Sequence, residues 1–167
     1  QVQDFKPLDV EAYRMSFEWN PPEFDGGEPI EIYQLKVQRL DRFIVQKGDI
    51  EDADSVSSHS DDDIFDVEDN YEYVERGEPK EYETEGLSLL INDVLPATYY
   101  DVYVSSRNRV GWTAPEEIFC FRLRTASAPP DPMAPVFAIS TTSHTVSIGW
   151  KPPLRENGER ILKYECQ

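Results

Sequence analysis

Hydrophobic and polar residues alternate with a period of two in several short segments of the chain. The first such segment contains Met15, Phe17 and Trp19, with polar residues between them, and it stops at Pro21. Alternation of this kind is typical of a β-strand with one buried face. Similar alternation or short apolar runs recur at 33–37, 43–45, 87–91, 100–104 and 118–123. Because prolines and turn residues separate these segments and no helical period is sustained, the sequence predicts an antiparallel all-β sandwich.

The opening pattern of the chain occurs a second time near its end. Aligning residues 13–35 with 144–166 gives eight identities in 23 positions, and the alternating apolar face is also kept. Self-similarity at a fixed offset is typical of repeated structural units. The prediction is a complete unit at 1–125, a stiff proline-rich linker at 126–135, and the first three strands of a second unit at 136–167.

Several motifs follow one another in a characteristic order. They are Trp-x-Pro-Pro at 19–22, Ile-x-x-Tyr at 30–33, Leu-Pro-x-Thr-x-Tyr at 95–100 and Asn-x-x-Gly at 108–111. In this order they resemble the fibronectin type III domain, an immunoglobulin-like sandwich. The resemblance covers 5–47, 87–125 and 129–166.

The resemblance to the fibronectin type III domain also implies roles for individual residues. It places Tyr100 in a tyrosine corner at the start of strand F, and it makes Trp19 the buried tryptophan of strand B. Large aromatic side chains on an alternating face are also expected in the core on physical grounds. The structural core expected from the two units comprises Trp19, Tyr33, Leu95, Tyr100, Trp150 and Tyr164.

Negative charge is concentrated in one segment of the chain. The formal net charge is −17, which argues against a nucleic-acid-binding protein, because such proteins need clustered cations. The range 49–85 contains 16 acidic side chains and two basic ones, whereas the rest of the chain contains 17 acidic and 14 basic ones. The chain is therefore a nearly neutral sandwich with an acidic insertion, placed where fibronectin type III domains have a short connection and one strand.

Two interpretations of the acidic segment differ in their consequences. In the first, it is a solvated, disordered insertion, which a sandwich tolerates because a longer surface loop costs little closure entropy. In the second, it is an interaction or regulatory loop that binds a basic surface. Ser58 and Ser60 each have Asp three residues later, the pattern that acidophilic kinases favour, so they are candidate phosphorylation sites.

A second candidate surface lies on the predicted strands F and G. The outward-facing residues there are cationic, and an exposed aromatic residue is expected in the loop between the strands. A cation–π ladder at this place would form a protein-binding surface. The alternatives are a stripe that only stabilises the sheet and a surface that receives the acidic insertion of the same chain. The candidate binding residues are Arg107, Arg109, Trp112, Arg122 and Arg124.

The sequence contains no arrangement that indicates catalysis, a cofactor or a metal ion. His59 and His144 are isolated, and the acidic run at 61–66 lacks the spaced ligands of a calcium loop. Cys120 and Cys166 are too few for a disulfide-rich scaffold, although they allow one disulfide. No apolar run approaches the length of about 20 residues that a membrane-spanning helix needs.

These observations and the resemblance predict a non-catalytic spacer and protein-interaction module within a larger modular scaffold protein. Its expected partners are other proteins and the neighbouring domains of its own chain, without nucleic acid. None of the five Asn residues begins a glycosylation sequon, which favours an intracellular scaffold of the cytoskeleton or cilium. The alternatives are an ectodomain of a receptor or adhesion protein and an accessory module of a larger enzyme.

Overall fold

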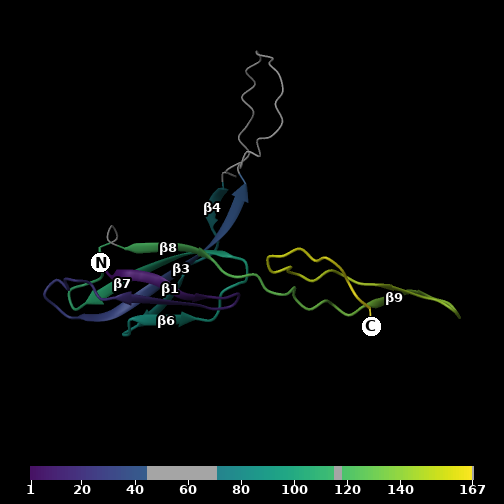
Figure 1. Cartoon of the computed structure of the whole chain (residues 1–167), viewed down its shortest axis with the longest axis horizontal. Helices are drawn as coiled ribbons and strands as arrows, with labels where there is room; N and C mark the ends of the chain where they lie inside the picture. The colour runs from purple at the N-terminus through teal and green to yellow at the C-terminus, as the bar shows by residue number, and fades with distance from the viewer. Residues whose placement is uncertain (45–70, 115–117, 167) are drawn as a thin grey trace, which may run out of the picture.

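The structure is a computed structural model that describes residues 1–44, 71–114 and 118–166. Every regular element in these ranges is a strand, so they contain no helix that could cross a membrane. Figure 1 shows a sandwich of strands in the first part of the chain, followed by a smaller unit at the C-terminal end. The strands are β1 (Gln3–Val10), β2 (Met15–Asn20), β3 (Ile30–Ile44), β4 (Tyr71–Glu75), β5 (Lys80–Thr84), β6 (Ser88–Ile91), β7 (Tyr99–Asn108), β8 (Phe119–Arg124), β9 (Phe137–Thr141) and β10 (Val146–Gly149).

Two antiparallel sheets form the first unit. One sheet has the order β1-β2-β6, and in the other the order is β4-β3-β7-β8 with β5 also pairing with β3. Strand β3 is the longest because it pairs along one side with β7 and along the other with β5 and then β4. This arrangement confirms the all-β sandwich without helices that the alternating pattern predicts.

The core lies between the two sheets and is built from the alternating positions. Met15, Phe17 and Trp19 of β2 face Leu35 of β3 and Val102 of β7, and all five side chains are buried. Fully burying side chains of this size stabilises a fold by about 1.5–3 kcal/mol each. The apolar faces predicted from the sequence therefore meet in one cluster.

Tyr100 at the start of β7 fixes the loop that precedes it. Its hydroxyl accepts a hydrogen bond of 2.8 Å from the backbone N–H of Leu95. Burial raises the pKa of the Tyr100 phenol. Thr125 closes the same loop from the end of β8, since its hydroxyl donates to the carbonyl of Leu95 at 2.6 Å. Both ends of the loop are thereby tied to the sandwich.

Part of the acidic range at 49–85 belongs to the sheet. Strands β4 and β5 lie in this range, and they pair with 40–44 and 33–37 of β3, respectively. Residues 71–84 are thus not an insertion outside the sandwich. In Figure 1, the end of β3 and β4 together extend away from the body of the first unit. Residues 45–70, with the remainder of the acidic run, lie outside the described residues.

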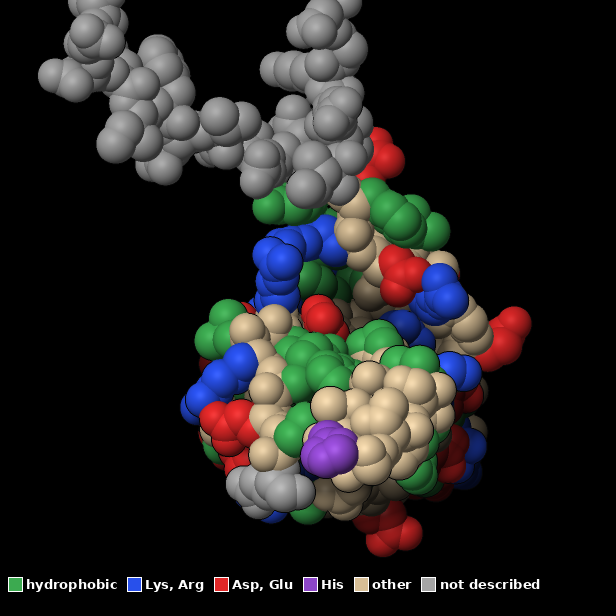
Figure 2. Space-filling view, turned by 90° about the vertical axis from the view of Figure 1, so that its right-hand side faces the viewer, with side chains coloured by type: hydrophobic (Ala, Val, Ile, Leu, Met, Phe, Trp, Pro, Cys, Tyr) green, Lys and Arg blue, Asp and Glu red, His purple; other side chains and the backbone are tan. Residues whose placement is uncertain are grey.

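The second unit is open on its apolar side. Strands β9 and β10 form a hairpin, and Trp150 packs against Tyr164 with ring centroids 5.7 Å apart. These two side chains were expected in a core, but they remain 38% and 41% exposed. Figure 2 shows hydrophobic side chains at the surface of this end of the molecule.

The expected third strand of the second unit is not formed, and residues 159–166 contain no strand. Its counterpart in the first unit, β3, is held by hydrogen bonds to β4, β5 and β7. Among the described residues, the second unit has no strands in the corresponding positions. A segment with strand-like alternation therefore has no neighbour to pair with.

Candidate functional site

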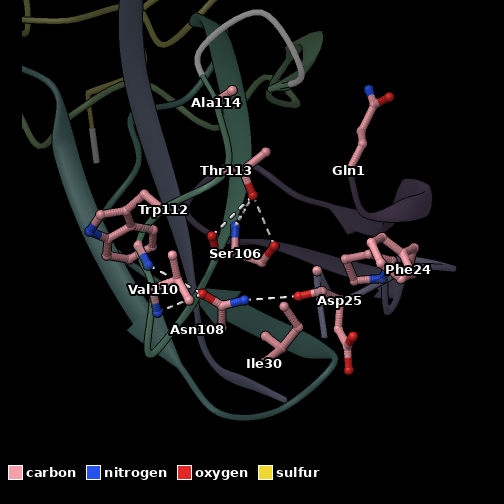
Figure 3. A pocket seen from close by; sticks show the side chains of 13 residues that line it. Gln1, Phe24, Asp25, Ile30, Ser106, Asn108, Val110, Trp112, Thr113 and Ala114 are labelled. Carbon is pink, nitrogen blue, oxygen red and sulfur yellow. Dashed lines mark hydrogen bonds between the residues drawn. The ribbon is translucent and has the colours of Figure 1, made fainter. Parts of the chain in front are cut away.

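A hollow of about 400 Å³ lies at one end of the sandwich, beside the turn that joins β2 to β3 and the loop that follows β7. Figure 3 shows that it is bordered by Phe24, Asp25, Val110 and Trp112, with Ile30 at its base. Loops at the end of a rigid sandwich are common positions for binding residues. This end of the first unit is called the loop end below.

Asn108 holds the two loops of the loop end together. Its side-chain amide donates to the carbonyl of Asp25 at 2.8 Å, and its side-chain oxygen accepts from the backbone N–H groups of Val110 and Gly111 (Figure 3). The backbone carbonyl of Gly111 also accepts a hydrogen bond from the backbone N–H of Asn108. The Asn-x-x-Gly motif thus builds a turn and ties it to the loop beside it.

Trp112 is held in place by the backbone on either side of it. Thr113 donates its N–H to the carbonyl of Ser106 at 2.8 Å, and its hydroxyl accepts the N–H of Ser106. The backbone of Trp112 forms an isolated antiparallel β-bridge with Arg107. The guanidinium carbon of Arg107 lies 5.2 Å from the centroid of the Trp112 indole. The indole remains 41% exposed, so a fixed aromatic surface faces solvent.

Phe24 and Val110 complete an apolar rim around the hollow. Their exposed fractions are 78% and 80%, which is high for side chains of this kind. Arg109, next to this rim, forms an ion pair with Glu28 and so connects the two loops once more. An exposed ion pair of this type contributes little to stability, at most about 1 kcal/mol.

The other two candidate arginines lie at the opposite end of the same sheet. Arg122 donates two hydrogen bonds to Asp101, at 2.7 and 2.8 Å, and Arg124 pairs in register with Tyr99. The single ladder around Trp112 that the sequence predicted is therefore wrong, and there are two clusters. Because β7 and β8 are antiparallel, the end of β8 lies beside the start of β7, far from residue 107.

Tyrosines and a further arginine surround Arg122 and Arg124. The guanidinium carbon of Arg122 lies 4.4 Å from the ring centroid of Tyr73, and that of Arg124 lies 5.8 Å from the ring centroid of Tyr99. The guanidinium carbon of Arg42, on β3, lies 5.1 Å from the same Tyr99 centroid. Sequence reasoning missed Arg42 and Tyr99, although the period of two places Arg42 on the face of β3 that points away from the core.

The candidate phosphorylation sites and the possible disulfide are the remaining predictions from the sequence. Ser58 and Ser60 lie outside the described residues. Cys120 and Cys166 are free and exposed, so the disulfide that the sequence allowed is not formed. In the described ranges, no group of three or more His, Cys, Asp or Glu side chains is arranged to hold a metal ion.

The linker is bound to the turn at 155–158 of the second unit. Asn157 donates to the carbonyl of Pro129 at 2.8 Å and to Asp131 at 3.0 Å, and Arg155 donates to the same carboxylate at 2.8 Å. These hydrogen bonds, first from Arg155 and then from Asn157, hold the pKa of Asp131 below its usual range. Ala128 also donates its N–H to the carbonyl of Asn157. The linker is therefore held by hydrogen bonds as well as by proline stiffness.

Gly158 brings the turn of the second unit against the first unit. A Cβ atom on this residue would lie 2.3 Å from the Cβ of Ala97 and 2.6 Å from the hydroxyl oxygen of Ser127. Its φ of +106° is also in the region that favours glycine. The second unit therefore approaches the loop before β7 closely at this point.

Comparison with curated proteins finds relatives along nearly the whole chain. Fibronectin type-III domain-containing protein 3A of mouse (Mus musculus) is 21% identical over 157 residues, which are 93% of this chain and 10% of that protein. The human (Homo sapiens) protein of the same name is 22% identical over the same share. The chain thus spans about a tenth of the length of these relatives. No protein-family model matches the chain.

Among solved structures, the chain is similar to two single domains of larger proteins. The FN5 domain of Drosophila Lar is 17% identical with a TM-score of 0.43, and the comparison covers 76% of this chain and 96% of that domain. The fn3 domain of the human collagen alpha-1(XX) chain is 14% identical with a TM-score of 0.45, over 78% and 88%. Together with the relatives named above, the sandwich of the first unit confirms the resemblance of this chain to the fibronectin type III domain.

Proposed function

We propose that this chain is a non-catalytic spacer and protein-interaction module within a larger modular scaffold protein. The observation that supports an interaction role is the loop end. Phe24, Val110 and Trp112 expose apolar surface there around a hollow, although the loops beneath them are fixed by hydrogen bonds. A rigid aromatic anchor loses little conformational entropy on binding, and such residues dominate many protein interfaces.

A role as spacer is supported by the linker. We propose that residues 136–167 are the beginning of a second fibronectin type III-like unit that follows the first in tandem. The hydrogen bonds from Arg155 and Asn157 to Asp131 hold the turn of the second unit against the linker, and Gly158 of this turn lies close to Ala97 of the first unit. Units joined in this way transmit a defined distance and orientation along a modular protein.

An intracellular scaffold, for example of the cytoskeleton or cilium, is the setting we propose. The supporting observations are the lack of glycosylation sequons in the sequence and two cysteines that are both free. Free exposed thiols are typical of a reducing compartment, since oxidising compartments favour disulfides.

The loop end can be tested by affinity capture with the full chain as bait, followed by quantitative mass spectrometry. Trp112→Ala removes the fixed indole and Val110→Ser removes an exposed apolar side chain, and neither belongs to the buried core. Each of the two variants should capture several-fold less of the specific partners. Aromatic anchors of interfaces typically contribute about 2 kcal/mol or more to the binding free energy.

Leu8→Ala is the matched control. Leu8 is an exposed apolar residue near the end of β1, on the far side of the sandwich from the loop end. Its removal should leave capture unchanged. If Trp112→Ala and Leu8→Ala give the same set of partners in the same amounts, the loop end is not the binding site and the proposal fails.

A further inference from the structure

Two arginines that form no ion pair with a carboxylate of the described residues lie on β3 and β8, on either side of Tyr99 of β7. Arg42 and Arg124 both approach Tyr99, at 5.1 and 5.8 Å from its ring centroid. Neither arginine forms an ion pair with a carboxylate of the described residues, whereas Arg122 beside them is paired with Asp101. The residues Arg42, Tyr99 and Arg124 are called the arginine–tyrosine surface below.

A shortage of acidic residues in the chain does not explain why Arg42 and Arg124 lack an ion pair. Acidic residues outnumber basic ones by 33 to 16. Within the described ranges, Arg39, Arg76, Arg109 and Arg155 each have a carboxylate partner, whereas Arg107 and Arg160, like Arg42 and Arg124, have none. An exposed cation–π contact of the kind that Arg42 and Arg124 make contributes about 0.5–1 kcal/mol to stability.

The tyrosines hold the guanidinium of Arg42 in position. It lies 4.0 Å from the ring centroid of Tyr71, and one of its N–H groups donates to the hydroxyl of Tyr99 at 2.8 Å. A guanidinium has five N–H donors, so others remain for a ligand. Because the side chain is already ordered, less conformational entropy is lost when a ligand binds.

A hollow of about 310 Å³ adjoins the arginine–tyrosine surface. It is lined by the end of β3, the residues before β7 and the end of β8. Its one lining carboxylate, Asp41, is paired with Arg76 at 2.7 Å. The charged groups of Arg42 and Arg124 therefore border a space that can accept a carboxylate side chain.

We propose that the arginine–tyrosine surface binds an acidic peptide segment of a partner protein. Guanidinium groups match carboxylates in geometry as well as charge, and tyrosine rings give flat surface for the peptide backbone. The net charge of −17 repels a large anionic surface such as a membrane or a nucleic acid. A thin peptide is affected mainly by charges within the Debye length, about 8 Å at physiological salt, so it can approach two local cations.

The arginine–tyrosine surface is separate from the loop end. Tyr99 and Arg107 lie near opposite ends of β7, and eight residues of strand at about 3.3 Å each separate them by about 26 Å. The proposal therefore goes beyond the function proposed above. Either can fail in experiment without the other.

Fluorescence anisotropy with the full chain tests the proposal directly. The probe is a labelled octapeptide of alternating Asp and Glu, and its counterpart of alternating Asn and Gln has the same shape without charge. The acidic peptide should bind and should be weakened by added salt. Arg42→Gln and Arg124→Gln should each weaken binding about three- to fivefold, the effect of one exposed charge pair, and together about tenfold or more.

Arg160→Gln is the matched control, because Arg160 is exposed in the second unit and its substitution removes the same charge. It should leave binding unchanged, as should Trp112→Ala at the loop end. Arg42→Lys with Arg124→Lys keeps the charge and should retain part of the affinity. If the double Gln variant does not fold, the affinity of this double Lys variant for the acidic peptide is compared with that of the unchanged chain instead.

Three results would overturn the proposal. The first is equal binding of the acidic and neutral peptides, and the second is equal weakening by Arg160→Gln and Arg42→Gln. The third is binding to phosphatidylserine vesicles in place of the acidic peptide, which would assign the surface to lipid.

Discussion

At the scale of single residues, motifs with a local geometric role could be predicted from sequence. The Leu-Pro-x-Thr-x-Tyr motif predicted the tyrosine corner, and the structure shows the hydroxyl of Tyr100 bound to Leu95. The Asn-x-x-Gly motif similarly forms a turn at Asn108. In both cases the partners lie within one short stretch of chain, so the motif itself contains both halves of the interaction.

Tyr100→Phe tests the energetic role of this corner. The variant keeps the ring in the core but leaves the N–H of Leu95 without its acceptor. We expect the free energy of unfolding to fall by about 1–3 kcal/mol, the cost of a lost hydrogen bond in a partly buried place. Urea denaturation followed by circular dichroism measures it.

Tyr13→Phe serves as control for the tyrosine corner, since Tyr13 is half exposed and should be insensitive to loss of its hydroxyl. Equal stability of Tyr100→Phe and the unchanged protein would show that the hydroxyl contributes nothing to the fold.

The arginines mark the limit of residue-level prediction. Their outward orientation followed from the alternation, but their grouping did not. Arg107 contacts Trp112, whereas Arg124 contacts Tyr99 at the other end of the strand. That separation depends on the antiparallel register of β7 and β8, which joins residues that are distant in the chain.

At the scale of elements, apolar alternation predicted β2, β3, β6, β7 and β8. It missed β1, whose Phe5 lies in the core, and it also missed β4 and β5. In these two strands, aromatic residues alternate with glutamates, as in Tyr71-Glu72-Tyr73 and Glu81-Tyr82-Glu83. The high negative charge of these strands obscured the alternation of their aromatic and acidic residues, which has a period of two. Glutamates are tolerated there because they lie on the solvated side of strands at the edge of a sheet.

The linker is the element whose role depends most on contacts distant in sequence. Gly158→Ala should push the turn of the second unit away from Ala97, since the added Cβ would overlap with it. The free and exposed thiols of Cys120 and Cys166 allow one spin label in each unit. Double electron–electron resonance should show a broader distribution of distances between the labels in this variant.

Gly27→Ala is the control for the linker experiment. Gly27 is the counterpart of Gly158 in the sequence repeat, has a similar positive φ of +87°, and has no atom within 4 Å of the added Cβ. It introduces the same kind of backbone strain without a clash between units. Identical distance distributions for the two variants would mean that Gly158 does not control the arrangement of the units.

At the scale of the whole molecule, the two units differ in how their apolar faces are covered. Trp19 and Tyr33 are buried in the first unit, whereas the repeat partners Trp150 and Tyr164 are open to solvent. The sequence repeat predicted that these two pairs of aromatic residues occupy corresponding positions in the two units. It also placed Trp150 and Tyr164 in the expected core, but burial depends on an opposite sheet, which the described residues of the second unit lack.

Acrylamide quenching of tryptophan fluorescence measures this difference. Trp112→Phe and Trp150→Phe should each remove part of the quenchable emission, since both indoles are exposed. Trp19→Phe should instead remove emission that is shielded from the quencher, because that indole is 3% exposed. Shielded emission from Trp150 would contradict the open apolar side of the second unit.

The sequence by itself determined the properties that are encoded locally. These are the class of fold, the faces that are buried, the turns and tyrosine corner, and the repeat of the opening pattern. Only the tertiary structure decided how the arginines divide between two ends of one sheet, that part of the acidic range pairs with β3, and that the linker is bound to the turn at 155–158. The reason is physical: period and turn chemistry are properties of neighbouring residues, whereas charge clusters, strand pairing and burial depend on the register of segments that are distant in the chain.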